Sequence, residues 1–235
     1  MVHLVGAGPG DPMLLTRRAA RLLAAADVVV LDRHSLDVIA AVAPVTAERI
    51  FVGRADGRPA WDTARIADLL AARAERSGSG SGPVVVRLKS GDPFVCSRGG
   101  EEMAALHARG IQVEVTPGVS AATAAPLAAG MARGRTVTIV AGNRDPVQPA
   151  TDMGALADAA GSLVVLVGRA HQATIAGALV AAGLDPATPA AVVHAATRPD
   201  ARVVHTTLGA LGDQRLPPPA TVVIGPAQEV TGARP

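Results

Sequence analysis

The sequence is poor in the residue types on which many binding and catalytic sites depend. It contains no tyrosine, two phenylalanines and one tryptophan, which argues against a surface that stacks the bases of single-stranded nucleic acid. Its single cysteine, Cys96, excludes an internal disulfide and a cysteine-based metal cluster. At this position we expect a small, half-buried residue.

Long apolar runs are also absent. No segment approaches the roughly 18 to 20 apolar residues of a membrane span, and the first residues lack the basic region and apolar segment of a signal peptide. We therefore expect a soluble cytoplasmic protein without a membrane partner. The 235 residues, 49% of them hydrophobic, suffice for one large domain or two modest ones around a real core.

Positive charge comes almost entirely from arginine, because Lys89 is the only lysine. The formal net charge is only +2, so a nucleic-acid partner is not expected. Scattered arginines suit a small polyanionic ligand, although a solvated surface accounts for most of them.

Several common catalytic motifs are missing. The six histidines are dispersed and show no metal-ligand spacing such as His-Glu-x-x-His, so we expect no metal site. There is no Gly-x-Ser-x-Gly elbow and no Gly-Lys-Ser/Thr phosphate loop. These absences exclude the commonest hydrolase and nucleotidase classes.

The segment from residue 84 to residue 102 organises the rest of the chain. Residues 84–88 form a largely β-branched run with little alternation, which predicts a strand buried on both faces of a parallel sheet. The turn 90–92 follows it, at the position where open α/β sheets bind ligands. Gly91 allows close approach of the backbone, and Asp92 offers a carboxylate to hydroxyl or ammonium groups. The helix expected next, from residue 100, carries acids in its first turn, where the helix dipole favours them.

The first turn of the chain is glycine-rich but departs from the dinucleotide fingerprint. A strand at residues 2–5 ends in the turn 6–11, and a helix with an apolar face is expected from Leu15 onward. Pro9 and an acid two residues later break the usual glycine spacing, although Asp32 follows at about the expected distance of 20 residues. A nicotinamide-dependent oxidoreductase that uses this turn and Asp32 therefore stays open.

The remaining elements alternate between strands and helices. Further strands are expected at residues 27–31, 49–52, 112–115, 136–140, 163–167, 191–194, 202–206 and 221–224. Further helices are expected at residues 35–43, 62–76, 100–109, 121–129, 153–160 and 172–182, with a short one near residue 208. We interpret the serine-glycine tract 77–82 as an enlarged loop within one domain rather than a linker.

This order predicts an α/β protein of two domains. Proline and glycine at residues 117 and 118 end the first sheet, so we expect an N-terminal domain at 1–117 and a C-terminal domain at 118–235. Each should hold a roughly five-stranded sheet flanked by helices, with the active-site cleft between the domains. Short turns between the last strands indicate an antiparallel portion in the second sheet.

Six segments, taken together and in order, resemble the tetrapyrrole methylase family. They are GAGPGDPMLLT, VVVLDRH, FVGR, VVRLKSGDPFVCSRGGEE, VTPGVSAATAAP and HAATRPDARVVHTTL. The resemblance covers nearly the whole chain. It implies methylation of uroporphyrinogen III by S-adenosylmethionine, giving precorrin-2 through precorrin-1 in sirohaem or cobalamin biosynthesis. It also implies a homodimer, with the methyl donor in the cleft and not held by the first glycine turn in the Rossmann manner.

The resemblance also implies roles for particular residues. Cofactor contacts would fall on Pro9, Ser90, Gly91, Asp92, Val95, Ser120, Ala121, Val167, Ala196 and Ala220. The catalytic proton acceptor would be Asp32, which works best as a base when desolvated. The family's proton-donor lysine corresponds to Arg54, and because arginine does not readily give up a proton, we expect that side chain to bind a carboxylate instead.

Arginines are the candidates for the carboxylates of the tetrapyrrole, since guanidinium groups pair with carboxylates in bidentate fashion. We single out Arg33 and Arg98, with Arg54, Arg133 and Arg135 beside them. Ser90, Cys96 and Ser97 stand where the family usually has glycine, an aromatic residue and glycine. These departures bear on the identity of the methyl acceptor more than on that of the methyl donor. A later precorrin methylase, or a protein or RNA methylase, therefore remains an alternative.

Overall fold

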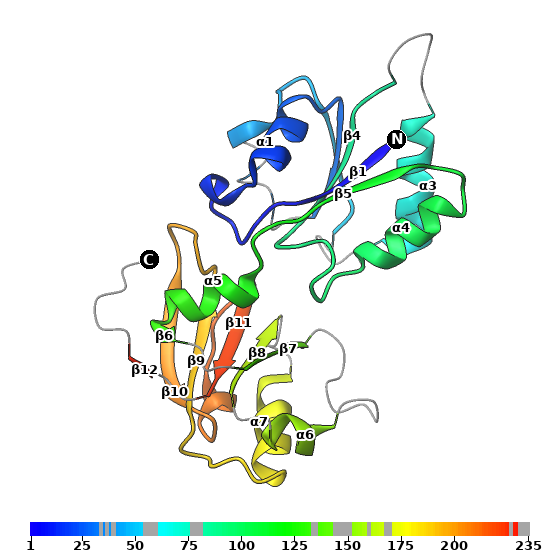
Figure 1. Cartoon of the computed structure of the whole chain (residues 1–235). Helices are drawn as coiled ribbons and strands as arrows, with labels where there is room; N and C mark the ends of the chain where they lie inside the picture. Colours follow the sequence, from blue (N-terminus) through cyan, green and yellow to red (C-terminus); the bar gives the residue numbers. More distant parts are fainter. Residues whose placement is uncertain are drawn as a thin grey trace. The chain divides into compact units, whose positions relative to one another are not determined.

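The computed structural model describes residues 1–32, 35, 38, 41–53, 61–75, 82–132, 136–142, 152–158, 161–166, 171–225 and 228–229. The chain divides into two compact units, Met1–Ser120 and Ala121–Pro235, and each unit is considered by itself. Each contains one five-stranded sheet flanked by helices (Figure 1), which confirms the predicted α/β class. Among the described residues, no helix is long and apolar enough to cross a membrane.

The sheet of the first unit is entirely parallel. Its strands are β1 (Val2–Gly6), β2 (Val28–Leu31), β3 (Glu48–Phe51), β4 (Val85–Lys89) and β5 (Val113–Thr116), in the order β3-β2-β4-β1-β5. Its described helical segments include η1 (Pro12–Leu14), α1 (Arg17–Ala24), α3 (Thr63–Ala74) and α4 (Gly99–His107). Because every strand runs the same way, the turns that follow all five strands lie at one edge of the sheet.

Helices cover both faces of this sheet, with α1 on one side and α3 and α4 on the other (Figure 1). Val86 and Leu88 pack with Leu23 of α1, whereas Val85 packs with Leu70 of α3 and Leu106 of α4. The prediction that residues 84–88 form a strand buried on both faces is therefore confirmed.

The first long helix begins later than its apolar pattern suggested. The hydroxyl of Thr16 accepts a hydrogen bond from the backbone N–H of Ala19 at 3.2 Å, and α1 starts at Arg17. A threonine whose side chain satisfies a free N–H in this way ends the preceding extended segment and fixes the first helical residue. Leu15 therefore lies before the helix, in the connection from η1, and not on its face.

The sheet of the second unit is mixed. Its strands are β7 (Val137–Ala141), β8 (Ser162–Leu166), β9 (Pro189–His194), β10 (Arg202–Thr207) and β11 (Ala220–Ile224), in the order β10-β9-β11-β8-β7. Only β7 and β8 are parallel to each other, and the other three pairings are antiparallel. The antiparallel portion that the short turns predicted is thus confirmed.

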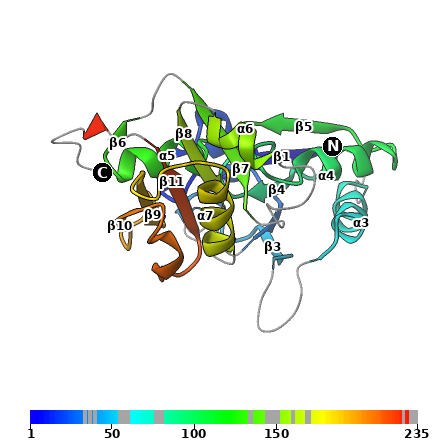
Figure 2. The same ribbon diagram turned by 90° about the horizontal axis from the view of Figure 1, so that it is seen from below.

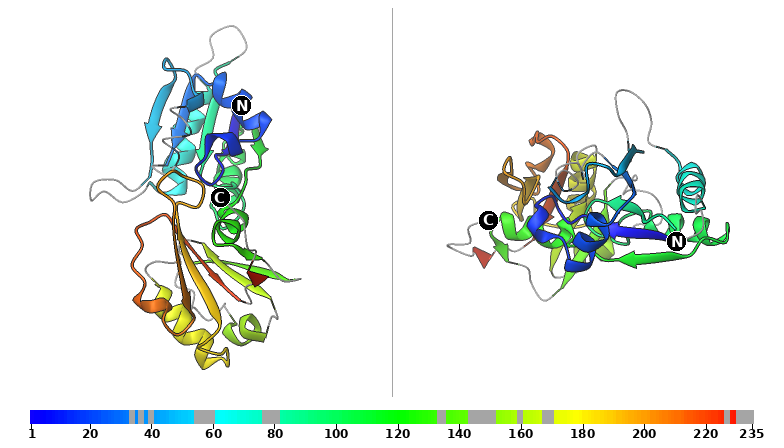
Figure 3. Two further views of the ribbon diagram at one scale, coloured as in Figure 1. Left: turned by 90° about the vertical axis from the view of Figure 1, so that its left-hand side faces the viewer. Right: turned by 90° about the horizontal axis from the view of Figure 1, so that it is seen from above.

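The described helical segments of this unit include α5 (Ala121–Ala128), α6 (Met153–Asp158), α7 (Gln172–Ala181) and η4 (Leu211–Asp213). Ile175 and Leu179 of α7 pack against Val192 and Val222, and α7 lies beside β9 and β11 in Figure 2. The alternate strand residues, such as Val223, pack against α5 on the other face. The left view of Figure 3 shows the green helix α5 next to this sheet.

One pairing had no counterpart in the sequence prediction. The two-residue strands β6 (Met131–Ala132) and β12 (Gln228–Glu229) pair antiparallel. They tie the segment after α5 to the region near the C-terminus. Two residues give too short a pattern for periodicity to reveal.

Candidate active site

The candidate site of the first unit lies at the carboxyl edge of its sheet. Asp32 follows β2, the turn 90–92 follows β4, the turn that contains Pro9 follows β1, and Ser120 ends the segment that follows β5. The parallel topology brings these four segments to one edge, which is where α/β sheets bind ligands. The structure thus gathers the site residues predicted for this half of the chain that are described.

A short backbone bridge joins the glycine-containing turn after β1 to the one after β4. The N–H of Gly8 donates to the carbonyl of Gly91 at 3.2 Å, and the N–H of Gly91 donates to the carbonyl of Gly8 at 2.8 Å. Both residues have positive φ, +74° and +66°, in the left-handed region that glycine adopts without steric cost. The two turns therefore form one connected piece of backbone.

This geometry does not suit the binding of a dinucleotide on the first turn. A Rossmann turn presents free backbone N–H groups to a pyrophosphate at the start of a helix. Here the N–H of Gly8 is used in the bridge, Pro9 has none, and the segment that follows is the three-residue η1 rather than an α-helix.

A third turn packs against the bridge with almost no space. A Cβ added to Gly118 would lie 2.2 Å from the carbonyl oxygen of Gly91, and one added to Gly6 would lie 2.6 Å from the backbone nitrogen of Gly118. Such distances are far below van der Waals contact. Glycine is thus required because three backbone segments meet there.

Asp92 fastens this arrangement. Its Oδ1 accepts a hydrogen bond from the N–H of Phe94 at 2.8 Å, and its Oδ2 accepts one from the N–H of Gly118 at 3.0 Å. The carboxylate therefore links the turn after β4 to the segment after β5. An ionised carboxylate oxygen can accept more than one hydrogen bond, so this role is compatible with ligand binding by the same group.

The residues around this turn are partly accessible. Ser90 is exposed, and its Oγ lies 3.3 Å from that of Ser35. Pro9 and Val95 are half-buried, whereas Arg98 is exposed at the N-terminus of α4.

Cys96 lies in the same loop. It is half-buried, as expected, and has a φ of +51°. Burial raises the pKa of its thiol, which disfavours the reactive thiolate. The loop therefore offers no activated nucleophile at this position.

Asp32 occupies a different environment from the desolvated one that its expected role as a base suggested. Its side chain is 32% exposed, and Nη2 of Arg87 lies 3.3 Å from both of its carboxylate oxygens. Arg87 itself is only 2% exposed. The carboxylate thus lies at the surface end of a buried cation.

That cation belongs to a buried group of charges that sequence reasoning missed. Arg87 Nε donates to Oε2 of Glu102 at 3.0 Å, and Nζ of Lys89 donates to Oε1 of the same carboxylate at 2.5 Å. Lys89 is 5% exposed and Glu102 is 2% exposed. The available signal was the pair of cations at alternate positions of an otherwise apolar strand.

The electrostatics of the group follow from burial and mutual attraction. Burial alone would raise the pKa of Glu102, but the positive charges of Arg87 and Lys89 outweigh it and lower that pKa below its ordinary value. Burial, together with the charge of Arg87, lowers the pKa of Lys89 despite the attraction of Glu102. Burial would also lower the pKa of Arg87, but Asp32 and Glu102 raise it.

Two predicted contacts of the second unit, Ala220 and Ala196, fall at one edge of its sheet. Ala220 begins β11 opposite His194, the last residue of β9, and Thr221 is opposite Leu166, the last residue of β8. Ala196 comes two residues after β9 and is buried, as is Ala220. Ala121 begins α5 and is half-buried.

Several predicted residues lie outside the described part of the chain. They are Arg33, Arg54, Arg133, Arg135 and Val167.

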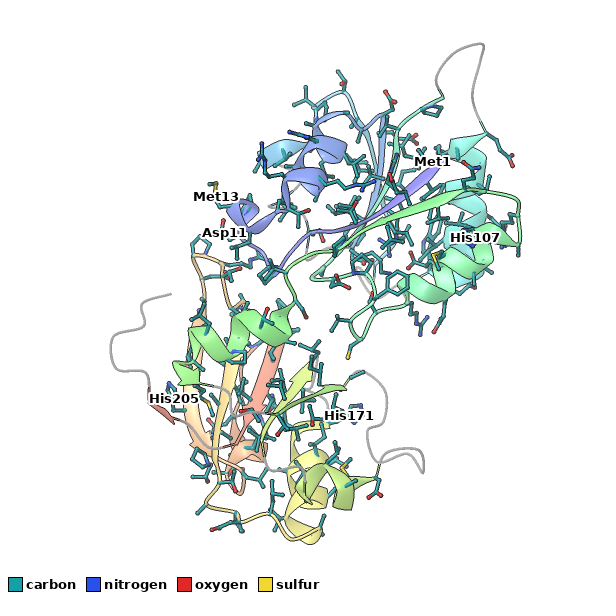
Figure 4. The ribbon with its side chains drawn as sticks, in the orientation of Figure 1. Met1, Asp11, Met13, His107, His171 and His205 are labelled. Carbon is teal, nitrogen blue, oxygen red and sulfur yellow. The ribbon has the colours of Figure 1, made fainter. Side chains whose placement is uncertain are left out.

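Figure 4 shows three of the histidines on separate elements, with His107 on α4, His171 at the start of α7 and His205 on β10. Within the described residues, no group of three or more His, Cys, Asp or Glu side chains could hold a metal ion.

Fold and site together define an α/β protein of two units, whose candidate site in the first unit lies at the strand ends and does not have the geometry of a Rossmann turn. The chain belongs to the tetrapyrrole methylase family. The family model described as Tetrapyrrole (Corrin/Porphyrin) Methylases matches residues 1–212. This assignment decides against the nicotinamide-dependent oxidoreductase.

Similar proteins agree with this assignment. The S-adenosyl-L-methionine-dependent uroporphyrinogen III methyltransferase of Methanosarcina barkeri is 39% identical over 95% of this chain and 90% of its own length. A siroheme synthase of Halorhodospira halophila is 38% identical over 97% of this chain, but this chain spans only 48% of its length.

Solved structures give the same result. The uroporphyrin-III C-methyltransferase of Thermus thermophilus, in complex with S-adenosyl homocysteine, is 38% identical with a TM-score of 0.77, covering 95% of this chain and 91% of that one. A cobalt precorrin-4 methyltransferase from cobalamin biosynthesis is 28% identical with a TM-score of 0.80, covering 95% and 94%.

Proposed function

We propose that this chain is an S-adenosylmethionine-dependent methyltransferase that converts uroporphyrinogen III to precorrin-2 through precorrin-1. The observation that carries the proposal is the 39% identity, over 95% of the chain, to a uroporphyrinogen III methyltransferase. The siroheme synthase and precorrin methyltransferase relatives agree with a place in sirohaem or cobalamin biosynthesis. A homodimer in the cytoplasm is part of the same proposal.

The strand-edge residues fit the methyl donor. Its sulfonium and ammonium groups are cationic, and Asp92 and Asp32 place carboxylates at the carboxyl edge of the first sheet. We assign cofactor binding to the residues predicted from the family: Pro9, Ser90, Gly91, Asp92, Val95, Ser120, Ala121, Val167, Ala196 and Ala220. When bound, the donor supplies a methyl group to an electron-rich pyrrole carbon.

The chain's own residues then position the reactants and remove one proton. A carbon–carbon bond forms as the carbon–sulfur bond breaks, the electron pair stays on sulfur, and the macrocycle loses a proton. Holding two reactants in line can contribute about 7 to 11 kcal/mol in favourable cases. We assign proton acceptance to Asp32 and binding of the substrate's carboxylates to Arg33, Arg54 and Arg98.

The decisive experiment is incubation with uroporphyrinogen III and S-adenosylmethionine, followed by the absorbance of the methylated product. Formation of precorrin-2 is expected. Methylation of a precorrin, but not of uroporphyrinogen III, would instead identify a later enzyme of the family. Calorimetry should show binding of S-adenosylhomocysteine and none of NAD.

A substitution tests the assignment of Arg98. Arg98→Ala should raise KM for uroporphyrinogen III by about tenfold or more, because a charge-assisted hydrogen bond to a carboxylate contributes roughly 1.5 to 3 kcal/mol. Affinity for S-adenosylhomocysteine, measured by calorimetry, should not change. An equal loss for both ligands would reject this role.

A further inference from the structure

The periodicity of two strands and one helix assembles the buried charges on one face of the first sheet. Arg87 and Lys89 lie two and four residues after Val85, and Asp32 lies two residues after Val30. Alternation along a strand therefore places all three on the face that carries Val30 and Val85, which α3 and α4 cover. Glu102 of α4 is one turn before Leu106, which packs on that face.

Arg87 connects the interior of this face to its edge. Its Nη1 donates to the carbonyls of Leu88 at 3.0 Å and Val30 at 3.4 Å. Its Nε and Nη2 reach Glu102 at 3.0 and 3.4 Å, and Nη2 also reaches Asp32 at 3.3 Å. The guanidinium is thus held by two strands and a helix, and one side of it is directed at the edge carboxylate.

Stability alone gives no reason for such a group. Buried ion pairs pay a large desolvation cost, and well-packed apolar residues in their place are often as stable or more so. The neighbouring buried residues on this face are valine, leucine, isoleucine and alanine, so the fold accommodates apolar side chains there. The one member with substantial exposure is Asp32, at 32%.

We propose that Arg87 and Glu102 are positioning residues for the Asp32 carboxylate. The inference rests on the proposed function, in which Asp32 accepts the proton. Arg87 fixes the orientation of the carboxylate from its buried side. Glu102 pairs with both Arg87 and Lys89, so Asp32 is not the only carboxylate that these cations attract.

The charges of this described group balance. Arg87 and Lys89 from β4 interact electrostatically with Asp32, and Glu102 from α4 pairs with both of these cations. Two cations thus face two carboxylates. Loss of Glu102 leaves one excess positive charge, whereas loss of Lys89 leaves one excess negative charge.

The test is the pH profile of kcat/KM for methylation of uroporphyrinogen III. Glu102→Gln keeps the shape of the side chain and removes its charge. We expect its acid limb to move to lower pH and kcat to fall about tenfold or more, a part of the roughly 10²–10⁴-fold contribution of a general base. Lys89→Met retains the Arg87–Glu102 pair and should move the acid limb to higher pH. If Glu102→Gln fails to fold, the direction in which Lys89→Met moves the acid limb of the pH profile decides the test alone.

Two control variants separate positioning from a structural role. Leu106→Ala destabilises the same face of α4 without changing a charge, and Glu48→Gln breaks an ion pair with Arg73, of 2.8 Å, elsewhere in the unit. Neither should shift the profile. A wild-type profile for Glu102→Gln and Lys89→Met, or an equal shift for Leu106→Ala, would overturn the inference.

A double variant tests whether the effect passes through Asp32. Adding Glu102→Gln to Asp32→Asn should leave the residual kcat within about twofold, because the group that Glu102 positions is already lost. A further loss of tenfold would show an independent role. If the unaltered protein does not methylate uroporphyrinogen III, the proposed function itself fails. If the unaltered protein methylates uroporphyrinogen III and the variants have its pH profile and kcat, only this inference fails.

Discussion

At the scale of single residues, the candidate site depends on the absence of side chains as much as on their presence. Gly6, Gly91 and Gly118 come from segments far apart in the sequence, yet their backbones meet within distances that no Cβ tolerates. Asp92 then joins two of these segments by hydrogen bonds to backbone N–H groups. The site is therefore assembled mainly from backbone, and its shape is sensitive to changes as small as one methyl group.

Gly118→Ala tests this sensitivity. The added methyl would lie 2.2 Å from the carbonyl oxygen of Gly91, so the backbone must shift, and we expect a loss of a few kcal/mol in the free energy of unfolding. Gly177→Ala is the control, since nothing lies within 4 Å of its added Cβ in α7; it should stabilise the protein by about 0.5–1 kcal/mol. Urea unfolding measures both, and equal values would contradict the packing described.

Asp92→Ala removes two hydrogen bonds to backbone N–H groups. We expect about 1–3 kcal/mol less stability and at least about tenfold weaker binding of S-adenosylhomocysteine by calorimetry. Asp62→Ala is matched to it, because Asp62 also accepts a backbone hydrogen bond, from Arg65 at 2.7 Å, at the start of α3. That variant should lose about 1 kcal/mol of stability and keep its affinity.

At the scale of elements, α4 is the helix whose role extends furthest beyond packing. Its Leu106 belongs to an apolar cluster. Glu102, one turn earlier, accepts hydrogen bonds from two cationic side chains of β4, Arg87 and Lys89. The sequence predicted that the helix dipole favours the acids in the first turn of this helix, and the exposed Glu101 fits that role. Glu102 instead has buried partners.

The contribution of Glu102 to stability should depend on pH in a definite direction. Its folded-state pKa is lowered from the ordinary value of 4.5, so its stabilising effect is complete above about pH 4.5 and is lost as the pH falls through the lower, folded-state value. Glu102→Gln should therefore cost about 3–5 kcal/mol near pH 7, where it leaves buried cations without their partner. The difference from wild type should shrink below pH 4.5, and unfolding by urea at several pH values measures it. A difference that stays constant down to pH 3 would contradict the ion pairs.

The sequence predicted the order and type of most elements because strong hydrophobic runs separated by glycine and proline leave few alternatives. It did not predict that Arg87 and Lys89 are buried, because their apolar neighbours dominate the pattern and their partner is 13 to 15 residues away on a helix. Charge pairing across elements is a tertiary effect that no local periodicity contains. The start of α1 was missed for a similar reason, since the capping hydroxyl of Thr16 outweighed the apolar spacing.

At the scale of the whole molecule, the two five-stranded sheets have separate cores and different topologies, one parallel and one mixed. In each unit, topology brings several of the described contact residues to one sheet edge. The turn 90–92 and Asp32 were singled out from residue patterns, whereas most of the other contact residues came only from the family resemblance. The convergence of their segments at the edges became visible with the strand order and register.

Ligand binding should stabilise the folded molecule as a whole. At a concentration of S-adenosylhomocysteine 100 times its Kd, linkage predicts about 2.7 kcal/mol of added stability. We expect thermal unfolding to shift upward by several degrees with S-adenosylhomocysteine and to remain unchanged with NAD. Stabilisation by NAD alone would contradict the proposed function.

The bridge between Gly8 and Gly91 has a consequence for the evolution of chain length in this molecule. The strands β1 and β4 are paired, and the bridge pairs Gly8 and Gly91 just beyond their ends. The number of residues between each strand and its bridging glycine is therefore fixed. One residue inserted or deleted between a strand and its glycine would put the two glycines out of register. Changes in length between each strand and its bridging glycine should therefore be rejected.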